Sequence, residues 1–542
     1  MKKILIVIAL LLIAVSSVTW LYFKNLTSET NCSANILKLI PDDAAFVFEY
    51  KNEDSFYEIF KNFTLFKDIL GANSFEQLSS LKTNFINDPQ LSGSLDKSKL
   101  YLSIHKTSKN QADFLIVAPL SKTYFKDISL TDFIQIFSKK FVVKTEKYDK
   151  EEIYKVLLKD NQSFKFIIHN SVLIGSYDLS LIKRSINQFT NAAKDAKNPS
   201  EIETPRNQNS IANLFINFSK LPDLLTNFSK CEKPENLSCL KNFKASAILN
   251  INYQSDAFMF SGITILDTIN QQYANLFLKQ QPGKLTLDKI VPIDGASYCS
   301  YYVSQTKKFQ QDLRKIFKQQ NVYQKLKNQM ETISKKHSIN IEKEFSQVLG
   351  NEFGVVQLAS GEKVGMVNTV NSGRAAFLLS TISSEIQTRI RRFDDSNLLY
   401  YFFGEPFLNF ERPYFATFDN YLIVSNSQPA LKFFLTNYEQ QKLLSQSEKY
   451  IHFQQYLSNL GNIFYFLHNK NATSIIKTFL SNQTNILLEG KGFQYQNIYG
   501  LSIQFSADKN KFYTNLYINI PDNKITPSVL EDSLYMDSLS KK

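Results

Sequence analysis

Hydrophobic and polar residues alternate along residues 164–168, which predicts a strand with one buried face. Asn170-Ser171 then offers a tight turn, because Asn adopts a positive φ at low cost. The strand pattern resumes at residues 172–174, and Asp178 is placed to cap a following helix. That helix is indicated by apolar residues at helical spacing: Leu179, Ile182, Ile186 and Phe189. The stretch therefore predicts strand, turn, strand and capped helix.

The same order of patterns returns in residues 414–435. Asp419-Asn420 makes the turn, and residues 421–424 form the second strand pattern. Ser427 lies 249 positions after Asp178 and is also a capping residue. Pro429 falls in the first helical turn, where its missing N–H does no harm.

Other segments repeat at nearly the same distance. Residues 213–216 and 462–465 are 249 apart, and Ile40-Pro41 precedes Val291-Pro292 by 251. The hairpin patterns at residues 247–266 and 500–520 are similarly spaced. Four segments in one order at a nearly constant shift indicate tandem duplication. The alternative is chance similarity among strands rich in Phe and Ile.

These patterns predict an α+β protein of two related tandem units. Each unit is expected to be a mainly antiparallel sheet with helices packed on one face, because tight turns join many strand pairs. The expected divisions are an N-terminal anchor helix (1–24), a stalk (25–35), a first unit (36–268), a connector (269–286), a second unit (287–520) and a polar tail (521–542).

Further elements complete the two units. Ser55-x-x-Glu58 predicts a capped helix, and residues 191–210 read as an exposed loop. A second helix is predicted by one apolar face: Phe309, Leu313, Ile316 and Phe317. The remaining strands are expected at residues 45–50, 100–104, 114–117, 298–303, 353–358 and 375–379. Residues 132–137 are expected to be helical.

The N-terminus carries a strong hydrophobic signal. Lys2 and Lys3 precede residues 4–23, which contain no charge and are long enough to span a bilayer as one helix. The aromatic residues before Lys24 resemble an interfacial belt. We expect a retained single-pass anchor in the inner membrane, with the bulk of the chain on the periplasmic side. A cleaved signal peptide is the alternative.

Composition supports a folded chain without pointing to a nucleic-acid partner. The 542 residues are 43% hydrophobic and 13% aromatic, with 45 Phe and 27 Tyr, which favours β structure. The net charge of +12 is spread along the chain without a long basic block. Such a charge favours anionic surfaces in general.

No motif for catalysis or cofactor binding is present in the sequence. The phosphate-binding loop, the dinucleotide fingerprint and the G-x-S-x-G elbow are all absent. No two of the five His have the i, i+4 spacing of a helical metal site. We therefore expect a protein that is not an enzyme and holds no cofactor or metal. A hydrolase site assembled from distant residues would need a His beside a carboxylate or hydroxyl in a pocket.

Three groups are weaker site candidates. Cys231 and Cys239 bracket a short polar loop and could form a disulfide outside the cytosol, or could be unrelated thiols. Arg389, Arg391 and Arg392 could bind an anionic partner, or could form a solvated helix end. Turn or cap roles are expected for two acidic pairs, Asp42-Asp43 and Asp394-Asp395, in preference to calcium binding.

The layout resembles a family of exported, membrane-anchored bacterial proteins of unknown function. In that family a hydrophobic segment precedes large repeats that open in Ile-Pro-x-x-Ala, as at residues 40–44 here. The second unit departs from the pattern at Val291 and Gly295. Usage rich in Lys, Asn, Ile and Phe is similar to that of bacteria of the Bacteroidetes type. The resemblance implies an envelope location and carries no catalytic residue.

Together these observations predict a non-enzymatic, membrane-tethered envelope protein. Its two units would bind or scaffold an envelope partner or a ligand. One alternative is a protein that handles lipids or other hydrophobic ligands in an apolar cavity. The other is the hydrolase with a site assembled from distant residues.

Overall fold

The computed structural model describes residues 36–51, 72–88, 92–95, 99–106, 112–158, 162–190, 212–226, 229–230, 243–254, 257–267, 271–481 and 498–519. The expected anchor, stalk and tail, the capped helix at Ser55 and the loop at 191–210 lie outside these ranges. Within them, no helix has the length and apolar character needed to cross a bilayer. The chain divides into two compact units, residues 1–208 with 212–227, and residues 209–211 with 228–542.

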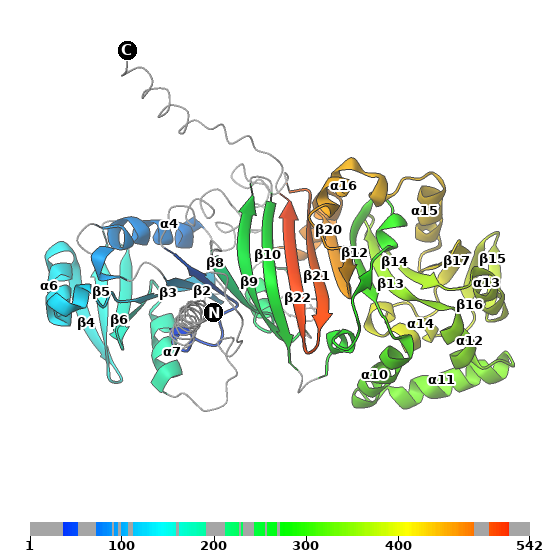
Figure 1. Cartoon of the computed structure of the whole chain (residues 1–542), viewed down its shortest axis with the longest axis horizontal. Helices are drawn as coiled ribbons and strands as arrows, with labels where there is room; N and C mark the ends of the chain where they lie inside the picture. The colour runs from blue at the N-terminus through cyan, green and yellow to red at the C-terminus, as the bar shows by residue number, and fades with distance from the viewer. Residues whose placement is uncertain are drawn as a thin grey trace, which may run out of the picture. The chain divides into compact units, whose positions relative to one another are not determined.

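The first unit contains an antiparallel sheet, of which eight strands lie in the described ranges (Figure 1). They are β1 (Phe46–Tyr50), β2 (Leu100–Lys106), β3 (Ala112–Pro119), β4 (Val142–Tyr148), β5 (Glu151–Leu157), β6 (Ser163–His169), β7 (Val172–Ser176) and β8 (Ala212–Asn217). Their pairings give the order β8-β1-β2-β3-β7-β6-β5-β4.

The second unit contains a larger antiparallel sheet. Its strands are β9 (Ala245–Gln254), β10 (Ala257–Leu266), β12 (Gly295–Tyr302), β13 (Leu349–Leu358), β14 (Lys363–Thr369), β15 (Ser383–Gln387), β16 (Ile390–Phe393), β17 (Tyr414–Phe418), β18 (Tyr421–Ser425), β20 (Ile463–His468), β21 (Gly500–Asp508) and β22 (Lys511–Asn519). The order is β9-β10-β22-β21-β20-β12-β13-β14-β18-β17-β16-β15. The hairpin β9–β10, expected in the first unit, pairs here with β22.

Eight neighbouring strands of the second sheet follow the same order along the chain as the eight strands of the first. The row β20-β12-β13-β14-β18-β17-β16-β15 corresponds, strand by strand, to β8-β1-β2-β3-β7-β6-β5-β4. The register agrees as well: Ile116 pairs with Gly175 in the first unit, and Gly365 pairs with Val424 in the second, each 249 positions later.

A buried serine occupies the same place in both units. Oγ of Ser176 donates to the carbonyl of Phe114 at 2.7 Å, and it accepts the N–H of Asp178 at 3.1 Å. Oγ of Ser425 donates to the carbonyl of Lys363 at 2.9 Å, and it accepts the N–H of Ser427 at 3.2 Å. Each serine therefore ties the end of one strand to its neighbour and to the start of the next helix.

Helices occupy the longer connections between strands. Those described in the first unit are α4 (Ala72–Leu81), α5 (Tyr124–Asp127), α6 (Leu130–Lys140), α7 (Leu179–Thr190) and α8 (Leu221–Leu225). Those in the second are α10 (Thr306–Gln319), α11 (Tyr323–Lys336), α12 (Ile341–Val348), α13 (Ser372–Thr381), α14 (Leu398–Phe403), α15 (Gln428–Glu439), α16 (Glu448–Gln454) and α17 (Asn469–Phe479).

The expectation that helices pack on one face only is wrong. In the first unit, Phe137 of α6 contacts Phe166 of β6, whereas Phe189 of α7 stacks on His169. Positions 166 and 169 point to opposite faces of the sheet, because side chains alternate along a strand. The central strands are accordingly buried on both faces, and every residue of β7 is buried. Two-sided burial favours the continuous apolar runs seen in these strands.

The predicted strand-turn-strand-helix stretches are both confirmed. Asn170 and Ser171 have φ of 48° and 61°, as a tight hairpin turn requires. Oδ1 of Asp178 accepts the N–H of Ser180 at 2.8 Å at the start of α7. Ser427 accepts the N–H of Ala430 at 3.3 Å at the start of α15. The helix around Phe309 is also confirmed as α10.

The strand expected at residues 375–379 is wrong, because this segment belongs to the helix α13. Asn371 caps that helix by accepting the N–H of Arg374 at 3.0 Å. Ala and Leu dominate the segment, and neither is β-branched, so its intrinsic preference is helical. The strand that follows β13 and pairs with it is instead β14. It begins two residues after Gly361, whose φ is +91°.

Candidate functional site

The first unit brings an aspartate, a histidine and a serine into one hydrogen-bonded row. Asp43 lies in the loop before β1, whereas Ser103 and His105 are two apart on β2 and point to the same face. Nδ1 of His105 lies 3.0 Å from Oδ1 of Asp43, and Nε2 lies 2.8 Å from Oγ of Ser103. Arg184 of α7 donates to the other oxygen of Asp43. We call these four residues the relay cluster.

The charges in the relay cluster decide where its protons lie. Burial lowers the pKa of His105, and its contact with Asp43 offsets this only in part. Burial alone would raise the pKa of Asp43, but the bond from His105 and the charges beside it hold that pKa below its usual range. An ionised carboxylate can only accept, so Nδ1 carries the proton of a neutral ring. Nε2 then accepts from the hydroxyl of Ser103.

This order of bonds is the one that activates the nucleophile in Ser-His-Asp hydrolases. An acyl-transfer site must also admit a substrate carbonyl to the serine and supply N–H donors for the oxyanion. Ser103 and His105 are both 0% exposed. Ser103 lies in mid-strand between its partners Val47 and Leu115. As described, the relay cluster fastens the loop before β1 to the sheet and to α7, and presents no nucleophile to solvent.

A small hollow lies beside the relay cluster. It is lined by Leu37, Ile40, Pro41, Asp42, Ala44, Val47, Phe215 and Asn217. Its volume of about 30 Å³ leaves room for about two water molecules. Asp43 and Arg184 are the relay residues that reach solvent in part, with side chains 31% and 33% exposed. Among the described residues, no three His, Cys, Asp or Glu side chains gather as a metal site requires.

Comparisons with known proteins add little to this geometry. No protein-family model matches the sequence, and no curated protein matches it either. The structure of crystal form IV of TP0453 is similar with a TM-score of 0.24 and 11% identity, over 43% of this chain and 81% of that one. Crystal form III of TP0453 gives 0.23 and 10%, over 46% and 89%. Similarity at this level carries no argument about fold or function.

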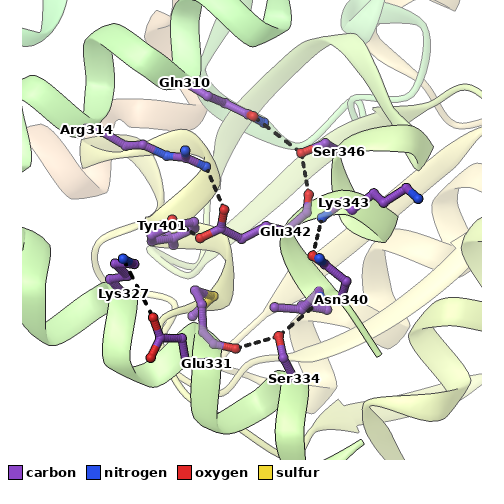
Figure 2. A network of polar contacts seen from close by, with 12 residues as sticks. Gln310, Arg314, Lys327, Glu331, Ser334, Asn340, Glu342, Lys343, Ser346 and Tyr401 are labelled. Carbon is purple, nitrogen blue, oxygen red and sulfur yellow. Dashed lines mark hydrogen bonds and ion pairs between the residues drawn. The ribbon is translucent and has the colours of Figure 1, made fainter. Parts of the chain in front are cut away.

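The second unit holds a polar network among α10, α11, α12 and α14 (Figure 2). Glu342 of α12 accepts from Arg314 of α10 at 3.1 Å and from the hydroxyl of Tyr401 of α14. Arg314 also lies 5.5 Å from the centre of the Tyr401 ring. Ser334 at the end of α11 accepts the N–H of Ile341, at 3.3 Å. These contacts join the four helices.

A buried carboxylate anchors the connector to the second sheet. Glu352 of β13 is 4% exposed and forms no ion pair within the described part of the chain. Its oxygens accept from the N–H and hydroxyl of Thr286, from the N–H of Leu287 and from the hydroxyl of Ser300. Burial nevertheless raises its pKa. Residues 271–286 of the expected connector (269–286) are therefore packed structure, with a 3-10 helix at Tyr273–Phe277.

Each of the three arginines predicted to bind an anion has a separate partner in the structure. Arg389 pairs with Glu439, Arg391 pairs with Glu385 at 3.3 Å, and Arg392 lies 5.0 Å from the centre of the Tyr414 ring. Arg391 and Arg392 are neighbours on β16, so they point to opposite faces of the sheet. The three guanidinium groups do not converge. Cys231 and Cys239 lie outside the described residues.

Sequence reasoning did not find the relay cluster. Asp43 and His105 are 62 positions apart, and no local pattern joins them. One signal was available, because Ser103 and His105 interrupt the apolar strand LYLSIHK at alternate positions. Polar residues two apart on a buried strand face need partners, since an unpaired buried polar group costs about 1–3 kcal/mol.

Proposed function

We propose that this protein is a non-enzymatic cell-envelope protein with two duplicated domains that bind or scaffold a partner. Residues 1–24 would tether it to the inner membrane, with the remainder on the periplasmic side. The hydrophobic run of residues 4–23 and its flanking lysines support the tether. The shared strand order and the paired serines at 176 and 425 support the duplication.

The proposed non-enzymatic role rests on the burial of the relay cluster, which keeps its serine away from solvent. The cluster is the one place in the described residues where a serine, a histidine and an aspartate share hydrogen bonds, and its serine is wholly buried. Polar clusters of this kind commonly fix a fold. A protein with duplicated sheet units, whose described residues hold no open Ser-His-Asp site, is suited to binding.

Protease accessibility tests the tether and its orientation. The full chain with a C-terminal epitope is expressed in a Gram-negative bacterium, and spheroplasts are treated with protease. We expect the epitope to be lost while a cytosolic marker stays intact. A variant lacking residues 4–23 is the control, since it should keep its epitope until the cells are lysed. Protection of the full-length epitope in intact spheroplasts would refute the proposed orientation.

The relay cluster also favours a second candidate, a serine hydrolase that opens on substrate binding. A fluorophosphonate reports on this, because it reacts covalently with activated serines. If the protein is not an enzyme, as we propose, neither the purified chain nor the Ser103→Ala variant should be labelled. Labelling that disappears in Ser103→Ala while Ser176→Ala retains it would establish the hydrolase instead.

A further inference from the structure

The strand β4 (Val142–Tyr148) ends the first sheet and leaves one of its hydrogen-bonding edges uncovered. It pairs with β5 along all 7 residues without a register shift, and no other described strand pairs with it (Figure 1). Thr145, at its centre, is exposed. An uncovered edge of this kind is a template on which a strand from another chain can add to the sheet.

The backbone groups at this edge point away from the sheet. Just after β5, the N–H of Leu158 donates to the carbonyl of Gln162 at 3.0 Å, so the even-numbered residues of that strand face β6. The odd-numbered residues of β5 therefore bond β4, and their partners there are the even-numbered residues. It follows that Val143, Thr145 and Lys147 direct their N–H and C=O groups outward. None of these groups has a partner among the described residues.

The equivalent edge of the second unit is poorly suited to pairing. There β15 takes the place of β4, but it is shorter, and its register with β16 shifts between Glu385 and Gln387. Such an irregularity bends a strand and is one way in which proteins blunt a sheet edge. A second copy of β15 paired about its centre would also bring Glu385 opposite Glu385. The longer and regular β4 lacks both obstacles.

The sequence of β4 is complementary to itself when two copies run antiparallel. With a two-fold axis at Thr145, all residues of the strand find a partner in the second copy. Lys144 then lies opposite Glu146 of the second copy, and the axis repeats this pair. Moving the axis by one residue would place Lys144 opposite Lys144, or Glu146 opposite Glu146, and like charges directly opposite are destabilising. The charges therefore select one register and one occupant, another copy of this strand.

The charges around β4 leave Lys144 without a carboxylate. Its cross-strand partner on β5 is Lys155, which has the same charge. Glu146 is already bonded by Lys155, and it lies 4.0 Å from Lys183 of α7. Lys144 itself forms no ion pair within the described part of the chain. Glu146 of a second copy would supply the missing counter-charge.

An apolar pair beside this edge is also left open to solvent. Val142 and Leu157 face each other across β4 and β5 and are 61% and 42% exposed. In the two-fold register Tyr148 of the second copy comes opposite Val142, and pairs of an aromatic and a β-branched side chain stabilise sheets. Edge lysines normally oppose pairing, but Lys147 already faces Glu152 on β5. Neither lysine of the strand would then lack an opposite charge.

We propose that two copies of this protein pair through β4 and join their first sheets into one antiparallel sheet. Val143, Thr145 and Lys147 of each copy donate and accept one backbone hydrogen bond apiece across the interface. The interface is isologous, as in most homodimers. Self-association goes beyond the binding role proposed above and does not depend on the membrane tether.

Sedimentation equilibrium of the full chain in density-matched detergent tests the proposal. Between about 1 µM and 200 µM we expect a monomer–dimer equilibrium, as a small interface implies. Thr145→Pro removes the central N–H, which bonds nothing within the described chain, and proline is tolerated at outward positions of edge strands. This variant should keep its circular dichroism spectrum and weaken self-association by about tenfold or more.

Reversing one charge at a time provides a sharper test of the register. Lys144→Glu and Glu146→Lys each put like charges opposite in a homodimer, so each should weaken self-association by about tenfold. Mixed together, the two variants restore opposite charges at both pairs, so they should associate with each other more tightly than either does with itself. The matched control is Lys432→Glu on the exposed side of α15, which should leave self-association unchanged.

The same measurements can refute the β4 dimer. A chain that stays monomeric throughout this range would leave β4 to a strand of another protein and would overturn the proposal. A dimer that all the variants retain would place the contact elsewhere on the chain and would overturn it too. If the two charge-reversed variants failed to prefer each other, the two-fold pairing would be wrong. None of these results bears on the protease assay, which tests the tether separately.

Discussion

At the scale of single residues, buried polar side chains set the most specific constraints in this molecule. His105 is fully buried in a largely apolar strand, and both of its nitrogens are bonded. A histidine held neutral in the folded chain charges more readily once the chain unfolds. The stability of the first unit should therefore depend on pH through this one ring.

The sign follows from the lowered pKa of His105. As pH falls through the ordinary histidine value of about 6.5, the unfolded chain takes up a proton that the folded chain refuses. The free energy of unfolding should then fall by up to about 1.4 kcal/mol per pH unit. Asp43 does not interfere, because its lowered pKa acts only at more acidic pH.

Urea unfolding at pH 7.5, 6.5 and 5.5 measures this dependence. His105→Gln should lose about 1–3 kcal/mol at pH 7.5 through unpaired partners, and should show a shallower fall toward pH 5.5. His452→Gln is the matched control, since His452 is exposed and its substitution leaves the His105 contribution in place. Identical slopes for the unaltered chain and His105→Gln would contradict the neutral buried ring.

At the scale of elements, the hairpin turn of β6 and β7 is held by residues with positive φ. Ser171 has a φ of 61°, which costs a residue with a side chain about 1–2 kcal/mol. Glycine at the second turn position removes that cost but loses more entropy on folding. We expect Ser171→Gly to stabilise the first unit by about 0.5 kcal/mol net. Thermal denaturation checks this, and Asn187→Gly on the exposed face of α7 should destabilise instead.

At this scale, the sequence predicts the elements that local interactions determine, and it does not predict contacts between distant positions. Residues 164–190 were predicted correctly because alternation, turn and cap are all local. The strand predicted at residues 375–379 is wrong because a short apolar run carries no period; the helix is fixed by its cap at Asn371, which lies before that run. The relay cluster and the strand order join positions far apart, such as Asp43 and Arg184, which are 141 apart. Pairing over such distances is decided by packing, and no local pattern encodes it.

At the scale of the whole molecule, the shared strand order makes the paired serines a natural test of the proposed duplication. Ser176 and Ser425 are 0% and 1% exposed, and each bridges a neighbouring carbonyl and the next helix. If the two units descend from one ancestor, the same substitution should have the same energetic effect in both. Loss of either hydroxyl leaves buried partners unsatisfied, at a cost of about 1–3 kcal/mol.

Differential scanning calorimetry can assign these effects to separate parts of the chain. The two compact units should unfold in two transitions, since most contacts of each unit are internal to it. Ser176→Ala should lower one transition and Ser425→Ala the other by a similar free energy, and the double variant should show both shifts. Ser380→Ala on the exposed part of α13 is the control and should move neither transition. If both serine substitutions moved a single shared transition, the units would fold as one. If only one serine mattered, the equivalence of the two sites would fail, because equal bonds in equal surroundings must cost the same to break.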